Sequence, residues 1–212
     1  MVEVAERGQS AKSRIIEAAK EMFFARGFSK VKVDEIAESL GMSKKTIYSC
    51  FKSKDKLLDA VLEWNLAEVY RKKEEIMNSS AGYMDKLYGI FSLITDTVSQ
   101  ISPKFMADLG RDRPDLWKKI EEFRRKNIIS TFSKLIDEGI GMGMIRKDVE
   151  KDIFILVLLN SVRGIINPET LSRHSLTGAK AFNGITRIVF DGILTDAAKS
   201  RSKALFVSSG AR

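Results

Sequence analysis

The chain has 212 residues, of which 44% are hydrophobic and 30% charged, and 36 Lys and Arg against 28 Asp and Glu give a formal net charge of +8. This hydrophobic fraction excludes a disordered chain, and the length suffices for one large domain or for a small domain joined to a larger one. Because the chain has one Cys and one His, we expect no disulfide framework, no metal site and no cofactor.

No segment has the pattern of a membrane or secretion signal. The first twelve residues lack the apolar block of a signal peptide. The most apolar run, residues 153–166, is interrupted by Asn160 and Arg163, and it is shorter than the ~20 residues that a bilayer requires. We therefore expect a cytoplasmic protein with no membrane partner.

Helical spacing of apolar residues dominates the N-terminal part of the chain. It predicts two helices, over about residues 10–26 and 33–40, each of which ends at a glycine. Ser43 is a good N-cap for a short third helix, and Ser53 for a long fourth helix that continues to about residue 78. The first three helices are expected to form a separate head at the start of the chain, and the fourth to link it to the rest.

A polar break at residues 78–82 separates this head from a larger helical part. Further helices are expected at about 83–101, 104–109, 114–138, 149–166 and 177–195. Pro114 begins the third of these and Gly139 is expected to end it. No stretch alternates with a period of two over a strand's length, so the predicted fold class is all-α.

Two domains follow from this order of elements. A three-helix helix-turn-helix head is expected over residues 1–56, with a long linking helix at about 53–78. A larger helical-bundle body is expected over residues 57–212, with a frayed, cationic and serine-rich tail from about residue 199.

The turn at residues 41–43 joins two short helices, as in a helix-turn-helix unit. The second helix of such a unit enters the major groove N-terminus first, so its early side chains must be polar. Residues 44–48 fit this demand, because their polar side chains can face outward while Ile47 faces the core. The lysines can reach phosphates or guanine, and Thr46 and Tyr48 can bind phosphate or thymine methyls. From periodicity and charge alone, an ordinary helical hairpin with a solvated lysine face is an equal alternative.

A longer series of matching residues supports DNA binding over an ordinary helical hairpin. It comprises Gly27-Phe28, Val33-Asp34-Glu35-Ile36-Ala37, Leu40-Gly41-Met42-Ser43-Lys44-Lys45-Thr46-Ile47-Tyr48, Phe51 and Ser53-Lys54-Asp55-Lys56-Leu57-Leu58. Over about residues 10–60 the chain resembles the DNA-binding domain of TetR/AcrR-type transcriptional regulators. The resemblance implies a homodimeric repressor that binds a double-stranded DNA operator, with a body that dimerises and binds a small apolar or amphipathic effector. The residues that it implies in DNA contact are Lys32, Ser43, Lys44, Lys45, Thr46, Tyr48 and Lys54.

Two positions depart from the family's pattern. Lys32 stands where the family usually has Thr or Ser, and a lysine cannot cap, so the second helix should start weakly although the charge can still meet a phosphate. Lys45 stands where many members carry Gly, which adds charge at the groove and can alter base preference.

The body resembles the family only loosely. The resemblance implies that the last two helices pair across a two-fold axis, and the expected interface residues are Ile153, Leu156, Val157, Val162, Phe182, Ile185, Val189 and Ile193. Aromatic and flexible apolar residues are candidates for the wall of an effector pocket, namely Phe91, Phe105, Met106, Leu109, Trp117, Phe123 and Phe132. Core packing is an alternative for every residue of both sets. Arg111 and Arg113 can meet an anionic ligand or, equally, lie at a solvated helix end.

The resulting hypothesis is a ligand-responsive homodimeric repressor that a small molecule releases from a near-palindromic operator. One alternative is a DNA-binding regulator or activator without an effector. The other is a helical-bundle enzyme, which the shortage of His, Cys and clustered carboxylates disfavours.

Overall fold

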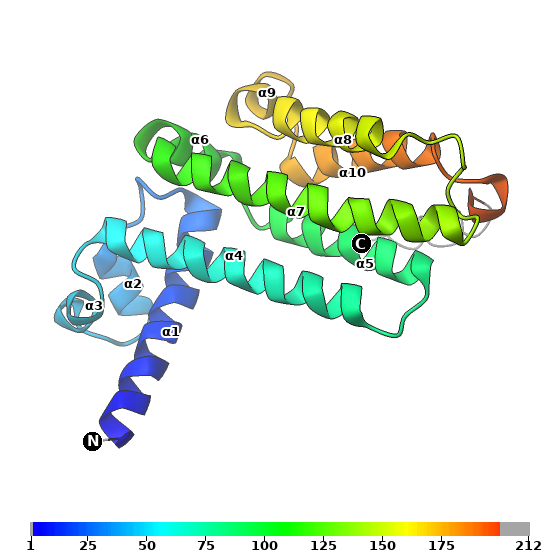
Figure 1. Cartoon of the computed structure of the whole chain (residues 1–212). Coiled ribbons are helices and arrows are strands. Elements are labelled where there is room, and N and C mark those ends of the chain that lie inside the picture. Colours follow the sequence, from blue (N-terminus) through cyan, green and yellow to red (C-terminus); the bar gives the residue numbers. More distant parts are fainter. Residues whose placement is uncertain (1, 200–212) are drawn as a thin grey trace.

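The computed structural model describes residues 2–199 of the chain, and the tail expected beyond residue 199 lies outside this range. The head consists of α1 (Val2–Arg26), α2 (Val33–Ser39) and α3 (Lys44–Cys50), and α4 (Lys54–Asn78) runs from the head along the body (Figure 1). The body contains α5 (Tyr83–Ser99), α6 (Pro103–Asp112), α7 (Pro114–Gly141), α8 (Lys151–Ile165), α9 (Pro168–Arg173) and α10 (Gly178–Asp191).

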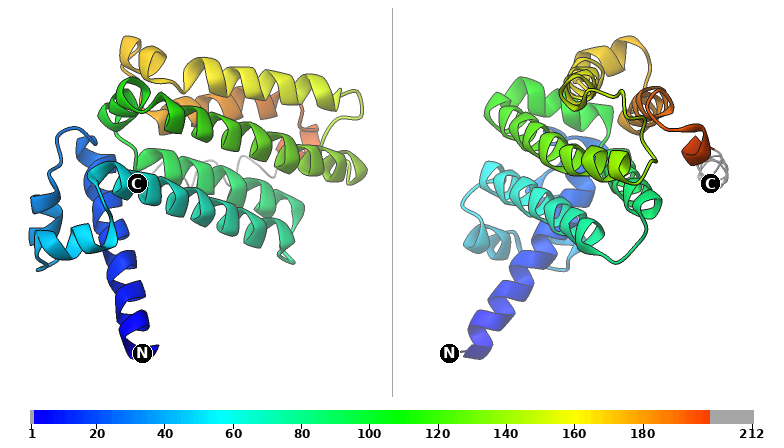
Figure 2. Two further views of the ribbon diagram at one scale, coloured as in Figure 1. Left: turned by 60° about the vertical axis from the view of Figure 1, so that its left-hand side comes forward. Right: turned by 45° about the vertical axis from the view of Figure 1, so that its right-hand side comes forward.

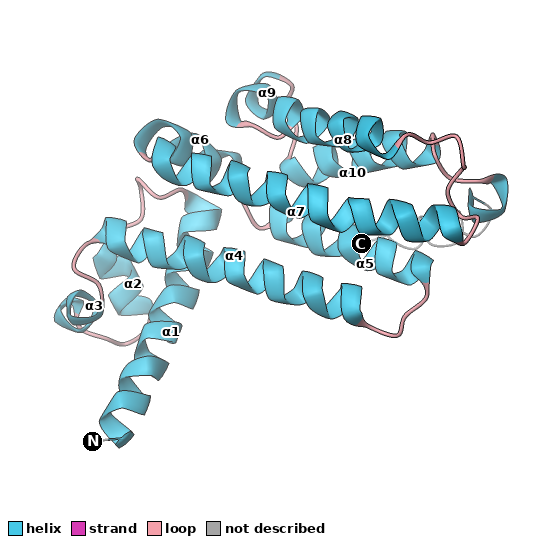
Figure 3. Ribbon diagram, in the orientation of Figure 1, coloured by secondary structure: helices cyan, strands magenta, loops and turns pink. Residues whose placement is uncertain are grey.

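The predicted all-α class is confirmed. Every named element within residues 2–199 is a helix (Figure 3), and the one isolated β-bridge there joins Ile145 to Leu194. In the body, α5 and α7 lie between α4 on one side and the pair of α8 and α10 on the other (Figures 1 and 2). The body is therefore a layered bundle, with α8 and α10 on the side away from α4.

The head folds around a small apolar core. Buried side chains of α1, α2 and α3, among them Phe23, Ile36 and Ile47, pack against the first turns of α4. Gly27 ends α1 as predicted, with a φ of 88° that favours glycine. The same core also includes Phe105 and Leu109 of α6, so the head is packed directly against a helix of the body.

The prediction that Gly139 ends a helix is wrong. Helix α7 continues to Gly141, and the residue with a positive φ after it is Gly143, at 69°. Gly139 lies inside the helix against Tyr83, whose ring and hydroxyl would overlap a Cβ at that position. A glycine is present there because two helices approach closely, which is a tertiary requirement that local sequence does not reveal.

The short helix α9 was not predicted. Its N-cap is Asn167, whose side chain accepts a hydrogen bond from the Thr170 N–H at 2.9 Å, and Pro168 occupies the first turn. An Asn-Pro pair is a recognisable helix start, but six residues are too few for a helical apolar period to appear.

Candidate functional site

Two hydroxyl groups lie at the N-terminus of α3, and one of them caps the helix. Ser43 Oγ accepts a hydrogen bond from the Thr46 N–H at 3.1 Å and lies 2.9 Å from Thr46 Oγ1. Farther along α3, Ile47 is buried and Tyr48 is 41% exposed. Helix α3 lies at the outer edge of the head with no body helix over it (Figure 1), so its polar face is open to a partner.

Of the four lysines expected at DNA, the three at or after the start of α3 differ in their surroundings. Lys44 Nζ forms an exposed ion pair with Asp34, at 2.9 Å from its carboxylate. Lys45 is exposed and has no ion-pair partner among residues 2–199. Lys54 lies over the Phe28 ring, 4.3 Å from its centroid, and partial burial lowers the pKa of this lysine although nearby carboxylates oppose the effect. Of these three lysines, Lys45 is thus the one that no other side chain holds.

Glu35 stabilises the start of α2, where Lys32 stands in place of the family's usual Ser or Thr. The exposed Lys32 side chain forms no capping hydrogen bond, but the Lys32 N–H donates to the Glu35 carboxylate at 3.0 Å. That hydrogen bond, and a second from Arg26, lower the pKa of Glu35 below its ordinary value. The helix start that the sequence predicts to be weak is therefore stabilised from within the helix.

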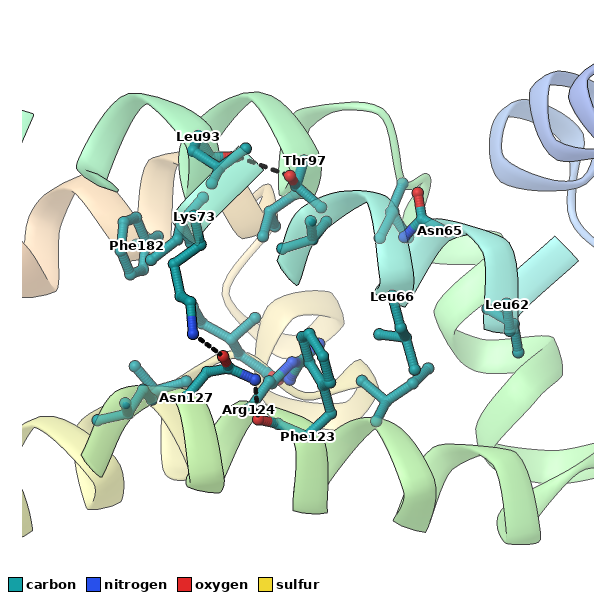
Figure 4. Close-up of a pocket in the computed structure, with 18 of the residues that line it drawn as sticks. Leu62, Asn65, Leu66, Lys73, Leu93, Thr97, Phe123, Arg124, Asn127 and Phe182 are labelled. Carbon is teal, nitrogen blue, oxygen red and sulfur yellow. Dashed lines mark hydrogen bonds between the residues drawn. The ribbon is translucent and has the colours of Figure 1, made fainter. Parts of the chain in front are cut away.

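The body contains a cavity of about 150 Å³, enclosed mainly by α4, α5, α6 and α7 (Figure 4). Six of the seven residues expected at an effector pocket line it, namely Phe105, Met106, Leu109, Trp117, Phe123 and Phe132. The seventh, Phe91, lies outside the cavity wall, with its ring centroid 4.7 Å from that of Phe190. On α5 the wall is formed instead by residues on the adjacent face of the helix, which include Ile90 and Ile94.

Six polar residues of the cavity wall were missed by the sequence analysis: Asn65, Lys73, Thr97, Arg124, Asn127 and Thr131. Asn65 and Lys73 lie on α4 and are each 8% exposed. A signal was available, because both continue the buried apolar stripe that runs through Leu58 and Leu62. A polar side chain at an apolar position of such a stripe is the mark of a site inside a core.

Lys73, Asn127 and Arg124 gather at one end of this cavity (Figure 4). Lys73 Nζ donates to Asn127 Oδ1 at 3.0 Å and lies 2.7 Å from a carboxylate oxygen of Glu74. Arg124 donates to the Ile166 carbonyl at 3.3 Å, and burial lowers its pKa although Glu121 acts in the opposite direction. This end of the cavity carries positive charge, whereas most of the remaining wall is apolar.

A second cluster of polar residues joins the head to α6. The buried carboxylate of Asp108 accepts the Ser29 N–H at 2.9 Å and lies 3.1 Å from Arg111. Asp112 accepts the Ser29 hydroxyl at 2.9 Å. A Cβ added at Gly27 would lie 2.7 Å from Asp108 Oδ2, so the chain approaches α6 closely here. The head is therefore hydrogen-bonded to the helix that lines the cavity.

Arg111 and Arg113 both belong to ion pairs outside the cavity wall. Arg111 pairs with the aspartates of α6, and Arg113 Nη2 lies 2.7 Å from Asp59 of α4. Neither arginine lines the cavity, so the expectation of a ligand contact at these two residues is not supported. The alternative, a solvated helix end, fits the largely exposed Arg111 but not Arg113, which is mostly buried.

The residues expected at a dimer interface fall into two groups. Ile153, Leu156 and Val157 of α8 are 56%, 54% and 47% exposed, and Val189 and Ile193 are partly exposed. The remaining three, Val162, Phe182 and Ile185, are buried in the core of the body and offer no surface to a partner. Ile188 of α10 was not among the predicted residues, and it is 77% exposed. Below, "α8–α10 face" denotes Ile153, Leu156, Val157 and Ile188.

The described part of the chain has neither a metal site nor a membrane-spanning helix. Among the side chains of residues 11–199, no group of three His, Cys, Asp or Glu is placed to hold a metal ion. No helix in the same range combines the length and the apolar character that crossing a bilayer requires.

The chain is similar to bacterial regulators over most of its length. Residues 15–61 match the family model described as "Bacterial regulatory proteins, tetR family". The chain is 24% identical over 184 residues to the uncharacterized HTH-type transcriptional regulator YvaF of Bacillus subtilis, which covers 86% of this chain and 95% of that protein. It is 24% identical over 147 residues to the HTH-type transcriptional repressor KstR2 of Mycolicibacterium smegmatis, with 68% and 72% covered.

Solved structures of this kind share the fold. The ketosteroid transcriptional regulator KstR2 of Mycobacterium tuberculosis superimposes with a TM-score of 0.56 at 21% identity, over 87% of this chain and 95% of that one. A TetR family regulator from Agrobacterium tumefaciens gives a TM-score of 0.65 at 16% identity, over 89% and 100%. The matched segment spans the head described above, including α2 and α3. The match over residues 15–61 therefore identifies the head as a TetR-family DNA-binding domain, and these relatives indicate that the chain is a DNA-binding transcriptional regulator with a helix-turn-helix head.

Proposed function

We propose that this protein is a cytoplasmic, homodimeric repressor that a small apolar or amphipathic effector releases from a near-palindromic operator. In this proposal residues 1–56 bind DNA and residues 57–212 bind the effector and dimerise. The observation that carries it is the double role of α6. One side of α6 lines the cavity with Phe105 and Leu109, while Asp108 of the same helix holds the Ser29 N–H of the head.

Repression requires affinity for an operator, and the head supplies cations for it. Lys45 is exposed and unpaired within the described chain, and Lys44 can exchange Asp34 for a phosphate. If a dimer neutralises about eight phosphates, the slope of log K against log salt concentration is about −7. Two recognition helices reach one face of B-DNA when they are about 34 Å, or a multiple of it, apart.

The α8–α10 face supports a homodimer. It gathers four of the large hydrophobic side chains that are exposed in the described chain, on two helices that pack side by side. Exposed apolar side chains that gather on two neighbouring helices are typical of an interaction site. A second copy of the same face, related by a two-fold axis, covers all four residues on each subunit.

Release of the operator needs an effector that prefers one body shape. A ligand that binds both shapes of the body equally does not shift the equilibrium between them. A hundredfold loss of operator affinity requires that the ligand bind one shape about 2.7 kcal/mol more strongly than the other. Because α6 contacts both the cavity and the head, a small displacement of α6 changes the direction in which α3 points. The relative KstR2 is named as a repressor, and this supports repression over activation.

The test combines three measurements on the purified full chain. Fragments selected from random DNA should share a near-palindromic sequence, sedimentation should give a dimer, and operator affinity should fall with salt as stated above. Candidate amphipaths are then screened for a rise in melting temperature and for release of the selected fragment. Binding of a palindrome that no ligand in the screen releases favours the alternative of a regulator without an effector.

A further inference from the structure

The size and the wall of the cavity restrict what it can hold. Its volume is about 150 Å³ and its wall is mostly apolar, with Phe24, Leu66, Val69, Ile94 and Phe123 among the lining residues. Since one water-sized group needs about 10–15 Å³ of such space, the cavity accommodates roughly ten to fifteen non-hydrogen atoms. A compact chain of methylene groups suits this wall, because the transfer of apolar groups out of water is favourable.

The cationic end of the cavity has more positive than negative charge. Lys73 is already compensated, because Glu74 lies 2.7 Å from its ammonium. Arg124 is different: no ion pair among residues 2–199 includes it, and of its five N–H donors one is directed at the Ile166 carbonyl. Arg124 is partly buried, and its guanidinium carbon lies 5.4 Å from the centroid of the Trp117 ring. A partly buried guanidinium without a carboxylate partner is unfavourable, so an anion from outside the chain is favoured there.

A surface groove between α7 and α8 continues the same charge. It shares Arg124, Ile128 and Val162 with the cavity wall, and so adjoins it. The charged residues of the groove are four cations against two acids, namely Lys118, Arg124, Arg125 and Arg163 against Glu121 and Glu122. An anionic group that approaches through this groove meets an attractive field before it reaches Arg124.

The other end of the cavity has an unpartnered amide. Asn65 is 8% exposed, lines the cavity, and forms no hydrogen bond within residues 2–199. Figure 4 shows it away from Lys73, Asn127 and Arg124, toward the opposite side of the site. Asn65 and Lys73 are eight residues apart on α4, which corresponds to about 12 Å of rise. A buried amide that lacks a partner is unfavourable, so a ligand group that pairs with it binds more tightly.

We propose that the cavity binds an amphipathic carboxylate whose headgroup pairs with Arg124 beside Lys73, whose apolar body fills the cavity, and whose far end hydrogen-bonds to Asn65. This inference rests on the proposed function, because it names the chemical class of the effector. The preferred ligand is a medium-chain carboxylic acid with a hydroxyl or carbonyl group remote from the carboxylate.

The first experiment compares ligands that differ only in charge or in the far-end group. The full chain is titrated by calorimetry at neutral pH with decanoate, decanol, decyltrimethylammonium and 10-hydroxydecanoate, each below its micellar concentration. We expect decanoate to bind at least tenfold more tightly than decanol, and the cation to bind most weakly. We expect 10-hydroxydecanoate to bind at least as tightly as decanoate, since Asn65 compensates the desolvation of the hydroxyl.

The second experiment assigns the headgroup contact to particular side chains. Arg124→Met should weaken decanoate binding at least tenfold and leave decanol binding within twofold. Lys73→Met should have a smaller effect in the same direction, because Glu74 already compensates Lys73. The matched controls Lys126→Met and Lys72→Met remove exposed cations that lie close to the two residues in sequence but outside the cavity and the groove, and they should leave both affinities unchanged. Asn65→Leu should reverse the order of decanoate and 10-hydroxydecanoate.

The outcomes separate this inference from the proposed function. Equal affinities for decanoate and decanol, failure of all four ligands to bind, or equal losses in Arg124→Met and Lys126→Met would each overturn the carboxylate assignment. If the ligand order and the variant effects hold but bound decanoate does not release the selected operator, the ligand class stands and effector-driven release is wrong. Circular dichroism of each variant confirms that it is folded before its affinity is compared.

Discussion

Replacing Asp108 with alanine tests whether the head is held to α6 by the hydrogen bonds described above. The carboxylate is 3% exposed and accepts the Ser29 N–H at 2.9 Å. A hydrogen bond to a charged acceptor contributes about 1.5–3 kcal/mol. The contact with Arg111 adds about 0–1 kcal/mol, because that arginine is largely exposed and its charge is screened. Asp108→Ala should therefore lower the free energy of unfolding by about 2–3 kcal/mol.

The measurement is urea unfolding of the full chain, followed by circular dichroism. The midpoint should fall while the slope with denaturant stays constant, because the same surface is exposed on unfolding. Asp112→Ala is the matched control: it removes an exposed carboxylate that contacts the same serine and the same arginine, and its effect should be smaller. A loss below about 0.5 kcal/mol for Asp108→Ala, or equal losses in both variants, would refute a structural role for the buried carboxylate.

Four further predictions concern the head, the dimer face and the body. Lys45→Ala should weaken binding of all DNA sequences and reduce the salt slope by about two per dimer if the lysine contacts phosphate, whereas relaxed preference at one base position would indicate guanine contact instead. Ile188→Glu should convert the dimer to monomers in sedimentation without loss of helicity, while Tyr70→Glu, an exposed residue on the opposite side of the body, should not; a dimeric Ile188→Glu protein would exclude the α8–α10 face. Tyr83→Phe should raise the free energy of unfolding by about 1 kcal/mol, since the buried Tyr83 hydroxyl has no hydrogen-bond partner within residues 2–199; a clear loss in urea unfolding would show that the hydroxyl is satisfied. Hydrogen bonds from Arg111 and Ser29 lower the pKa of Asp112 from 3.8 to about 2, so the stability that this group contributes is complete above pH 3.8 and is lost as the pH falls toward 2; the difference in melting temperature between the wild type and Asp112→Asn should shrink over that interval, and a constant difference would contradict the assignment.

Local sequence determined most of the helices and the character of the head. Helix caps and helical periods depend on residues within one or two turns of each other, so Ser43, Ser53 and Gly27 could be recognised without the fold. The polar face of α3 follows from the same local rules. The long register of residues around it was specific enough to indicate the TetR family, which the comparisons confirm.

The site in the body depended on contacts between distant segments, and only the tertiary structure decided it. Arg124 and Lys73 are 51 positions apart and meet only because α7 packs against α4. Which apolar residues face the cavity and which face the core is set by the rotation of each helix, and for this reason Phe91 lies outside the wall while Phe132 lies in it. A helical period reports that a side chain is buried, but the partner it meets there is chosen by the packing of other helices.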